Sequence, residues 1–219
     1  MTINDQLREL FTRYQTTIKN LYDGQFPYPW NHEIDSCQKF AHLLQNHANP
    51  FSRTNYFGHI TGSAFIYHPK TQKVLLTLHK KLGKWLQLGG HSDSQCLPHQ
   101  TAIREGLEES GLHSLSFSPL LPNVGQNPLP FDLDIHVIPE RKNEPQHFHF
   151  DVRYLLRCNE PMENISLSDE SSDLAWMSLS QAKEKTTELS MHRQFDKFIK
   201  LSQSSLINQQ PKEEPNHVV

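Results

Sequence analysis

Apolar residues in the first part of the chain recur with helical spacing. They fall every three or four positions between residues 3 and 22, which predicts an amphipathic helix there. The segment FPYPW at 26–30 interrupts this pattern, because proline cannot occupy the interior of a helix. A second helix is predicted over 33–46. Residues 1–55 are therefore expected to form a helical N-terminal extension.

From residue 58 onward the pattern changes to short apolar runs that are typical of strands. The predicted strands cover 61–67, 73–79, 131–138, 147–156 and 173–179. Between them lie a predicted loop at 81–91, a helix from Pro98 to Glu109 that Gly111 ends, and a last helix at 180–201. This order predicts an α/β fold with a mixed sheet over residues 56–202. We expect the polar residues 203–219 to form a disordered tail.

Composition excludes several classes of partner. The 219 residues include 21 Lys and Arg against 24 Asp and Glu, so no basic surface for a nucleic-acid polymer is expected. No apolar run approaches the roughly 18 residues needed to cross a membrane, and the N-terminus lacks the apolar core of a signal peptide. Three cysteines without CxxC spacing are typical of a reducing compartment. These features predict a cytoplasmic protein that binds neither nucleic acid nor membranes.

The predicted helix at 98–109 carries three carboxylates on one face. Glu105, Glu108 and Glu109 stand at positions i, i+3 and i+4. A bound cation would reverse their mutual repulsion, and carboxylate oxygens are ligands that suit Mg²⁺. Arg104 lies one turn before Glu108 and is placed to orient that carboxylate by a salt bridge. Taken alone, the three carboxylates are also consistent with a solvated acidic helix face.

The residues around these carboxylates favour the cation. The order Gly90, Arg104-Glu105, Glu108-Glu109, Gly111 and Leu112 resembles the Nudix box, G-x5-E-x7-R-E-U-x-E-E-x-G-U, where U is a bulky aliphatic residue. The spacing is kept from Gly90 to Leu112 without a gap. Two positions depart from the pattern: Cys96 replaces the first glutamate, and Gly106 replaces an aliphatic residue. The chain is thus identified as resembling the Nudix hydrolase family.

This resemblance implies a Nudix-type α/β/α sandwich and a hydrolase of small molecules. The implied reaction cleaves a phosphoanhydride bond in a nucleoside diphosphate linked to another moiety. Glu105, Glu108 and Glu109 would bind Mg²⁺ or Mn²⁺, Arg104 would orient them, and Gly90 would lie in the loop that receives the diphosphate. The N-terminal extension is expected to cover the site, to mediate a homodimer, or to do neither.

In Nudix enzymes the general base is often a carboxylate on a later loop, which makes Glu170 the best candidate and Glu140 and Glu144 weaker ones. Because Cys96 replaces a glutamate of the box, a catalytically silent ligand-binding or interaction module is the alternative function. The layout is also similar to that of isopentenyl diphosphate isomerase. Gly89 stands where that family has its catalytic cysteine, so isomerase activity is not expected.

Polar and apolar residues alternate along the strands predicted at 131–138 and 147–156. In an antiparallel pair, a register that places His136 opposite His149 also places Asp134 opposite Asp151. Facing aspartates repel unless a proton, a cation or an arginine lies between them. This polar face is therefore interpreted as a solvated surface, as the wall of a substrate cleft, or as a second metal site.

The metal interpretation depends on the mixture of imidazoles and carboxylates, which suits Zn²⁺, Mn²⁺ or Fe²⁺. The candidate residues for this second metal site or cleft are His136, His147, His149 and Asp151 of the strand pair and His91 from outside it, with His59 as a further outside candidate.

Overall fold

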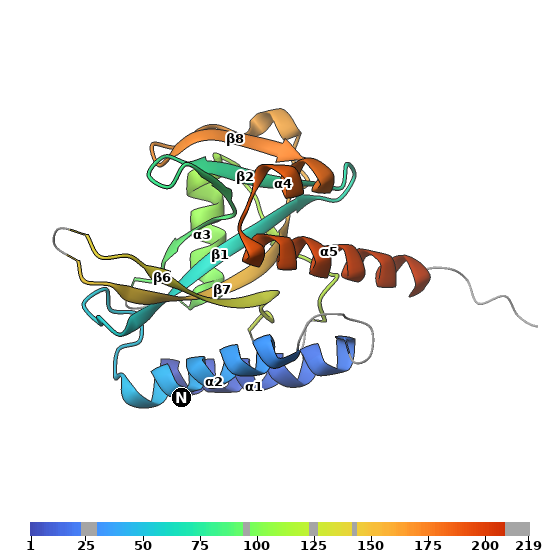
Figure 1. Ribbon diagram of the computed structural model, residues 1–219. Coiled ribbons are helices and arrows are strands. Elements are labelled where there is room, and N and C mark those ends of the chain that lie inside the picture. The colour runs from blue at the N-terminus through green and yellow to red at the C-terminus, as the bar shows by residue number, and fades with distance from the viewer. Residues whose placement is uncertain (23–29, 94–96, 123–126, 142–143, 209–219) are drawn as a thin grey trace, which may run out of the picture.

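The computed structural model describes residues 1–22, 30–93, 97–122, 127–141 and 144–208, which fold around one twisted mixed sheet (Figure 1). The central strand β1 is antiparallel to β2 and β4 and parallel to β7, and β7 in turn pairs with β6 and β5. Strand β2 also pairs with β3 and β8. The strands are β1 (Gly58–His68), β2 (Lys73–His79), β3 (Lys84–Leu86), β4 (Leu88–His91), β5 (Ser116–Phe117), β6 (Asp132–Ile138), β7 (His147–Arg157) and β8 (Ser171–Met177).

Helices cover both faces of this sheet. The helices are α1 (Ile3–Tyr22), α2 (Trp30–Asn46), α3 (Pro98–Ser110), α4 (Leu179–Lys185) and α5 (Leu189–Asn208), with a 3-10 turn at Met162–Asn164. Gly106 of α3 packs against Ala64 of β1, whereas the neighbouring Phe65 packs at a tilt against Phe195 and Phe198 of α5 at 5.9 and 5.5 Å between ring centroids. Successive residues of a strand point to opposite faces, so α3 and α5 lie on opposite sides (Figure 1). The predicted α/β/α sandwich is confirmed.

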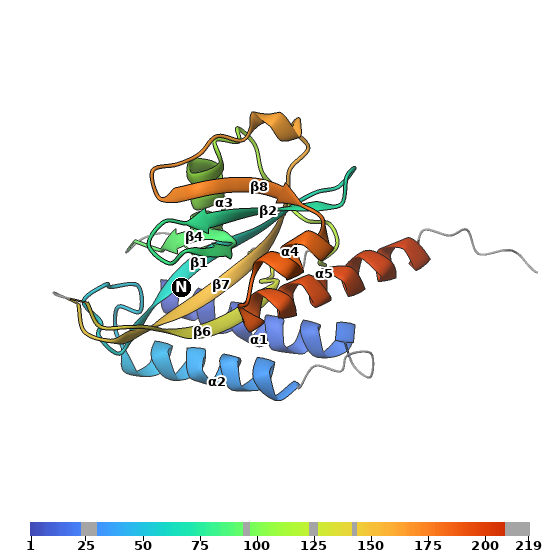
Figure 2. The same ribbon diagram turned by 45° about the horizontal axis from the view of Figure 1, so that its top comes forward.

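The two N-terminal helices run side by side below the sheet in both ribbon views (Figures 1 and 2). The ring of Phe40 in α2 packs on Phe11 in α1 at 4.7 Å and meets Phe150 of β7 edge-on at 5.2 Å. These three rings belong to a hydrophobic core that continues into the sheet and α5. The predicted helical extension is therefore present, and it is packed into the same core as the sheet.

Two glycines allow α3 to lie close against the sheet. A Cβ atom on Gly62 of β1 would lie 2.4 Å from the carbonyl oxygen of Pro98, which leaves no room for a side chain. Gly106 faces Ala64, Ile66 and Leu115 at short distances. Glycine costs about 1 kcal/mol relative to alanine inside a helix. The departure from the box at this position therefore accompanies tight packing between α3 and β1.

Three features differ from the sequence-based prediction. The predicted loop at 81–91 contains β3 and the four-residue strand β4. The last helix is divided into α4 and α5, because Thr186 takes an extended conformation and its side chain accepts a hydrogen bond from the Glu188 N–H at 3.3 Å. Helix α5 also continues to Asn208, past the predicted domain end at residue 202. The remainder of the predicted tail, 209–219, lies outside the described residues.

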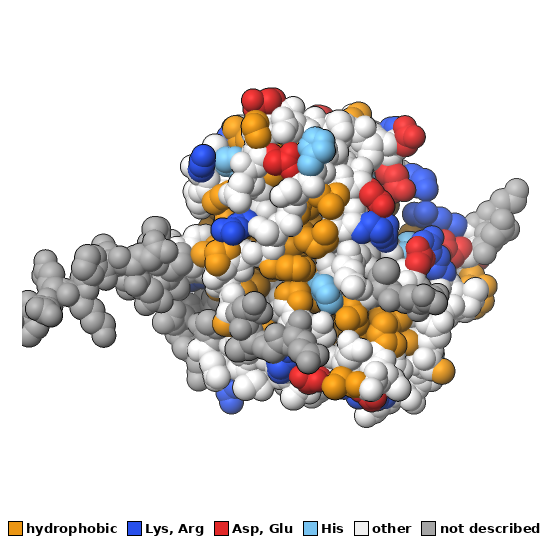
Figure 3. All heavy atoms as spheres, turned by 180° about the vertical axis from the view of Figure 1, so that it is seen from behind, with side chains coloured by type: hydrophobic (Ala, Val, Ile, Leu, Met, Phe, Trp, Pro, Cys, Tyr) orange, Lys and Arg blue, Asp and Glu red, His pale blue; other side chains and the backbone are white. Residues whose placement is uncertain are grey.

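The described part of the chain offers three further observations, on its surface, its cysteines and its helices. Viewed from behind, acidic and basic side chains lie beside one another along one side of the molecule, and hydrophobic side chains gather nearer the middle (Figure 3). Cys37 and Cys158 are free and buried. Within the described ranges, every helix is too short or too polar to cross a lipid bilayer.

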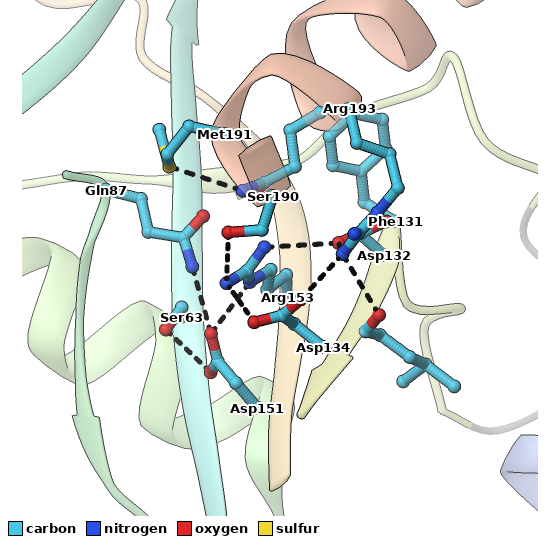
Figure 4. A network of polar contacts seen from close by, with 12 residues as sticks. Ser63, Gln87, Phe131, Asp132, Asp134, Asp151, Arg153, Ser190, Met191 and Arg193 are labelled. Carbon is cyan, nitrogen blue, oxygen red and sulfur yellow. Dashed lines mark hydrogen bonds and ion pairs between the residues drawn. The ribbon is translucent and has the colours of Figure 1, made fainter. Parts of the chain in front are cut away.

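The β6–β7 pair has the register expected from its alternation, with His136 opposite His149 and Asp134 opposite Asp151. The charge between the two aspartates is that of Arg153 (Figure 4), whose guanidinium donates to Asp151 at 2.8 Å and to Asp134 at 2.9 Å. Burial raises the pKa of Asp134, but Arg153, His136 and Arg193 outweigh burial and hold this pKa below its usual range. Of the proton, cation and arginine considered for this position, the structure contains the arginine.

The same ionic network ties the N-terminal helices to the sheet. Arg193 of α5 donates to Asp132 at 2.7 Å, and Lys197 one turn later donates to Asp132 at 2.5 Å. The Lys197 ammonium also contacts Glu33 of α2, which accepts a hydrogen bond from Tyr14 of α1 at 2.7 Å. All of these side chains are buried. Lys197 therefore connects α1, α2, α5 and β6 through charge.

Replacing Lys197 by methionine is expected to lower the free energy of unfolding by about 3–5 kcal/mol, because Asp132 and Glu33 then lose a buried cation. The matched control is Lys183→Met, since Lys183 forms a partly exposed pair with Asp196 at 2.6 Å and should contribute at most about 1 kcal/mol. Urea unfolding of both variants measures the difference. Equal losses would contradict the role given to Lys197.

Candidate active site

The carboxylates of α3 differ in how deeply they are buried. The helix begins at Pro98, and Gly111 ends it in the left-handed conformation with φ of 70°, its N–H donating to the Leu107 carbonyl at 2.9 Å. Near this end Glu109 is only 8% exposed, whereas most of the Glu108 side chain lies in solvent. The helix thus presents one buried and one open carboxylate a single residue apart.

Three consecutive residues of β4 contact this helix. The N–H of Gly89 donates to Oε1 of Glu109 at 2.9 Å. Gly90 lies directly against Glu105, since a Cβ atom there would be 2.4 Å from Oε1 of that carboxylate. The carbonyl of His91 accepts a hydrogen bond from the Arg104 guanidinium at 3.0 Å. The glycines are thus required by close approach, and they place two carboxylates beside the backbone of β4.

Arg104 also pairs with the carboxylates next to it. Its guanidinium lies 2.9 Å from Glu108 Oε2 and 2.8 Å from Glu105 Oε1. The salt bridge expected between Arg104 and Glu108 is present. Because the guanidinium is also bound to the His91 carbonyl, Arg104 holds both carboxylates in a fixed orientation relative to β4.

The site carries more negative charge than its arginine offsets. Burial raises the pKa of Glu109 to about 7; the Gly89 N–H opposes this shift, while the charges of Glu105, Glu170 and Glu108 add to it. Burial likewise raises the pKa of Glu105, with Arg104 opposing. Among the described residues the cation paired with this group of carboxylates is Arg104. A cluster of hard oxygen donors with excess negative charge fits a divalent cation such as Mg²⁺.

Glu170 lies in the exposed turn before β8, close enough for its charge to raise the pKa of both Glu105 and Glu109. Its turn is held by Lys80, whose N–H donates to the Glu170 carbonyl at 3.0 Å and whose ammonium donates to the Asp169 carbonyl at 2.7 Å. The fold thus brings the predicted base toward α3. The weaker candidate Glu144 instead lies 3.7 Å from the ring of His147.

The histidines form a second group on neighbouring strands. One ligand nitrogen each of His59, His91 and His149 lies within 4.8 Å of the other two. The ring of His147 stacks on His59 at 4.9 Å, and the ring of His136 lies 5.5 Å from His149. Sequence alternation identified three of these five rings, His136, His147 and His149, as candidates. His91 and His59 were predicted only as candidates from outside the strand pair, because both lie far away in the sequence.

Asp151 lies outside this histidine group. Its Oδ1 accepts hydrogen bonds from Ser63 at 2.7 Å and Thr61 at 3.0 Å, and its Oδ2 accepts from Gln87 at 3.0 Å and Arg153 at 2.8 Å (Figure 4). Four donors thus surround the carboxylate. The contacts from Ser63 and Gln87 could not be predicted from the sequence, because neither residue type is specific for a site. Cys96, the departure within the box, lies outside the described residues.

The carboxylates and the histidines lie on the two sides of β4. Gly90 faces Glu105, and the next residue, His91, directs its ring toward His59 and His149. Adjacent residues of a strand point in opposite directions, so these contacts are a direct consequence of strand geometry. The structure therefore contains two separate clusters of potential metal ligands that share one short strand.

The fold and site together define an α/β/α protein whose loop and helix carry a cluster of carboxylates. The model of the NUDIX domain matches residues 59–198, which is more than half of the chain. The chain belongs to the Nudix family, and the resemblance noted in the box is confirmed.

Individual relatives are more distant. A protein of Lactococcus lactis subsp. cremoris named as a probable DHNTP pyrophosphohydrolase is 33% identical over 101 residues, which are 46% of this chain and 55% of the relative. The chain thus spans about half the length of this curated relative. Similar solved structures include an Ap4A hydrolase complex of C. elegans, with 20% identity and a TM-score of 0.49, covering 68% of this chain and 97% of that one. Another is the dihydroneopterin triphosphate pyrophosphohydrolase of E. coli, with 16% identity and a TM-score of 0.48, covering 64% and 93%.

Glu109 should make the metal-free protein less stable as the pH rises. Its pKa is about 7 in the folded protein against a reference value of 4.5, so the folded state holds this proton more tightly. Its contribution to stability is complete below about pH 4.5 and is lost as the pH rises through about 7. We expect the free energy of unfolding of Glu109→Gln to exceed that of the wild type by about 1–3 kcal/mol at pH 8, with a smaller difference at pH 5.

Chemical unfolding with a chelator present measures this difference at both pH values. Glutamine keeps an oxygen that can accept the Gly89 hydrogen bond, so the comparison isolates the buried charge. A difference that is the same at pH 5 and pH 8 would show that ionisation of Glu109 is not responsible.

Proposed function

We propose that the chain is a divalent-metal-dependent pyrophosphohydrolase, which cleaves a phosphoanhydride bond in a nucleoside diphosphate linked to another moiety. The main support is the contact of Gly89 with Glu109 and of Gly90 with Glu105, which holds two carboxylates against a glycine backbone. The name of the Lactococcus lactis relative supports pyrophosphohydrolysis as the reaction class. The substrate is expected to be a small molecule, and we expect the protein to act in the cytoplasm.

In this proposal Glu105, Glu108 and Glu109 hold Mg²⁺ or Mn²⁺. A divalent cation supplies charge neutralisation at phosphoryl oxygens and makes bound water more acidic. The raised pKa of Glu109 shows that the protein alone stabilises its ionised form poorly, and a bound cation would stabilise that form. Arg104 keeps Glu105 and Glu108 oriented through its two salt bridges.

The remaining steps are assigned to side chains beside the carboxylates. Glu170 accepts the proton of the water that attacks phosphorus. The new P–O bond forms as the bridging P–O bond breaks, and the leaving phosphate group takes the bonding electron pair. The hydrogen bond from the Lys80 N–H holds the main chain from which the Glu170 carboxylate extends.

Phosphate release from nucleotide sugars, dinucleoside polyphosphates, ADP-ribose, NADH and nucleoside triphosphates, with Mg²⁺ or Mn²⁺, tests the reaction. Turnover of one class should fall at least about 100-fold in Glu109→Gln, because a lost metal ligand removes several kcal/mol of transition-state stabilisation. The control is Glu184→Gln, which changes an exposed glutamate on α4 and should keep full activity.

If the folded wild-type protein releases no phosphate from any substrate of this panel, the alternative function is favoured, a catalytically silent ligand-binding or interaction module. Cys96 in place of the first glutamate of the box is the feature that supports this alternative. Equal turnover in the wild type and Glu109→Gln would contradict the assignment of α3 as the active site.

Glu170→Gln should lower kcat by about 10²–10⁴-fold with a smaller change in KM, because general bases typically contribute that much. Loss of the base should also flatten the acid side of the pH–rate profile. The neighbouring Asp169→Asn is the matched control, since Asp169 holds the turn through its main-chain carbonyl and not through its carboxylate. Full activity in Glu170→Gln, or an equal loss in Asp169→Asn, would contradict the assignment of the Glu170 carboxylate as the base.

A further inference from the structure

Three imidazoles converge where β1, β4 and β7 lie side by side. His59 of β1 is paired with His149 of β7, and His91 of β4 is paired with Thr61, two residues along the same face of β1. The register of the sheet therefore fixes all three rings on one face, and one nitrogen of each lies within 4.8 Å of the others. The convergence does not depend on a flexible loop.

His59 lacks the partners that a buried imidazole normally has. Its side chain is 0% exposed, and within the described part of the chain neither ring nitrogen makes a hydrogen bond. The backbone of Asn55 is near enough to favour the protonated ring slightly, but burial and the neighbouring rings outweigh it. Buried polar atoms without a partner are uncommon, and each requires an explanation such as an ion. This ring is directed into the cluster formed with His91 and His149.

The rings are suited to donate lone pairs to a cation. Burial and neighbouring imidazoles lower the pKa of His149 to about 2 and the pKa of His59 to about 4, and burial followed by Arg53 lowers the pKa of His91. Neutral imidazole is the form that binds metal. The positive charge of Arg53 is offset by its pair with Asp93 at 2.9 Å.

The carboxylate of Glu144 adds negative charge near the three histidines. Glu144 raises the pKa of His91 and lies 3.7 Å from Nε2 of His147, the ring that stacks on His59. The Nδ1 atom of His147 is 2.8 Å from the Pro145 carbonyl and donates to it, so the ring is oriented by the backbone. A cation at the three histidines would therefore meet neutral nitrogens with carboxylate charge behind them.

We propose that His59, His91 and His149 bind a divalent transition metal of the Zn²⁺ class, at a site separate from the carboxylates of α3. Three histidines with a fourth position left open are a known arrangement for Zn²⁺. Nitrogens bound to one tetrahedral Zn²⁺ lie about 3.4 Å apart, so small rotations of the half-buried His91 and His149 complete the site.

The site would also stabilise the strand that positions the carboxylates. His91 supplies a ligand on one side of β4, while its carbonyl binds Arg104 and the two preceding glycines contact Glu109 and Glu105. Metal at the histidines is thus a positioning element for α3 and does not share its ligands.

Metal binding by the full chain tests this inference independently of any hydrolytic activity. Chelator-treated protein is titrated with Zn²⁺ and with Co²⁺ in excess Mg²⁺, which occupies hard carboxylate sites. One Zn²⁺ per chain and the visible absorption of nitrogen-coordinated Co²⁺ are expected. His91→Asn and His149→Asn should each weaken Zn²⁺ binding at least about 100-fold, more than loss of an outer-shell partner.

Two controls separate this site from its surroundings. His136→Asn changes a ring beside His149 that is not a proposed ligand, and Glu109→Gln changes the carboxylate site; both should keep the wild-type affinity for Zn²⁺. Imidazole ¹⁵N shifts of the wild type should show three histidines responding to Zn²⁺, a result that does not depend on any variant folding. Absence of Zn²⁺ uptake, wild-type affinity for Zn²⁺ in the two ligand variants, or loss of Zn²⁺ binding in Glu109→Gln would overturn the proposal.

Discussion

The hydrogen bond from the Gly89 N–H to Glu109, at 2.9 Å, is the contact on which the arrangement of the site depends. It holds a buried carboxylate against a strand backbone and thereby sets the distance between β4 and α3. That distance requires glycine at residue 90, where Glu105 occupies the space of a side chain, and the matching approach of α3 to β1 requires glycine at residue 62, where Pro98 does so. The glycines, the arginine and the carboxylates of the box are therefore parts of one packing arrangement.

The buried carboxylates are neutralised differently at two places in the structure. Around Asp132 and Asp134, the cations of Arg153, Arg193 and Lys197 match buried carboxylates, and the result is a network that joins α2, α5 and the sheet. At α3, Arg104 is the paired cation among the described residues, and the pKa of Glu109 is raised instead of lowered. The first arrangement is complete within the protein, whereas the second fits a further cation from solution.

Much of this could be predicted from local patterns. The facing of Asp134 and Asp151 followed from alternation along two strands, and the common face of the α3 carboxylates followed from helical spacing. Long-range partners could not be predicted from the sequence. Lys197 contacts Glu33, which lies 164 residues earlier in the chain. His59 comes to lie beside His149 only because β1 pairs with β7. The strand β4 was missed because glycine weakens the strand pattern.

In the proposed arrangement, β4 separates a carboxylate metal site from an imidazole metal site. Anomalous X-ray scattering from crystals that contain both Mn²⁺ and Zn²⁺ tests this directly. The predicted result is Mn²⁺ beside Glu105 and Glu109 and Zn²⁺ among His59, His91 and His149, on opposite sides of β4. Both metals in one of these positions, or neither metal beside β4, would contradict the account.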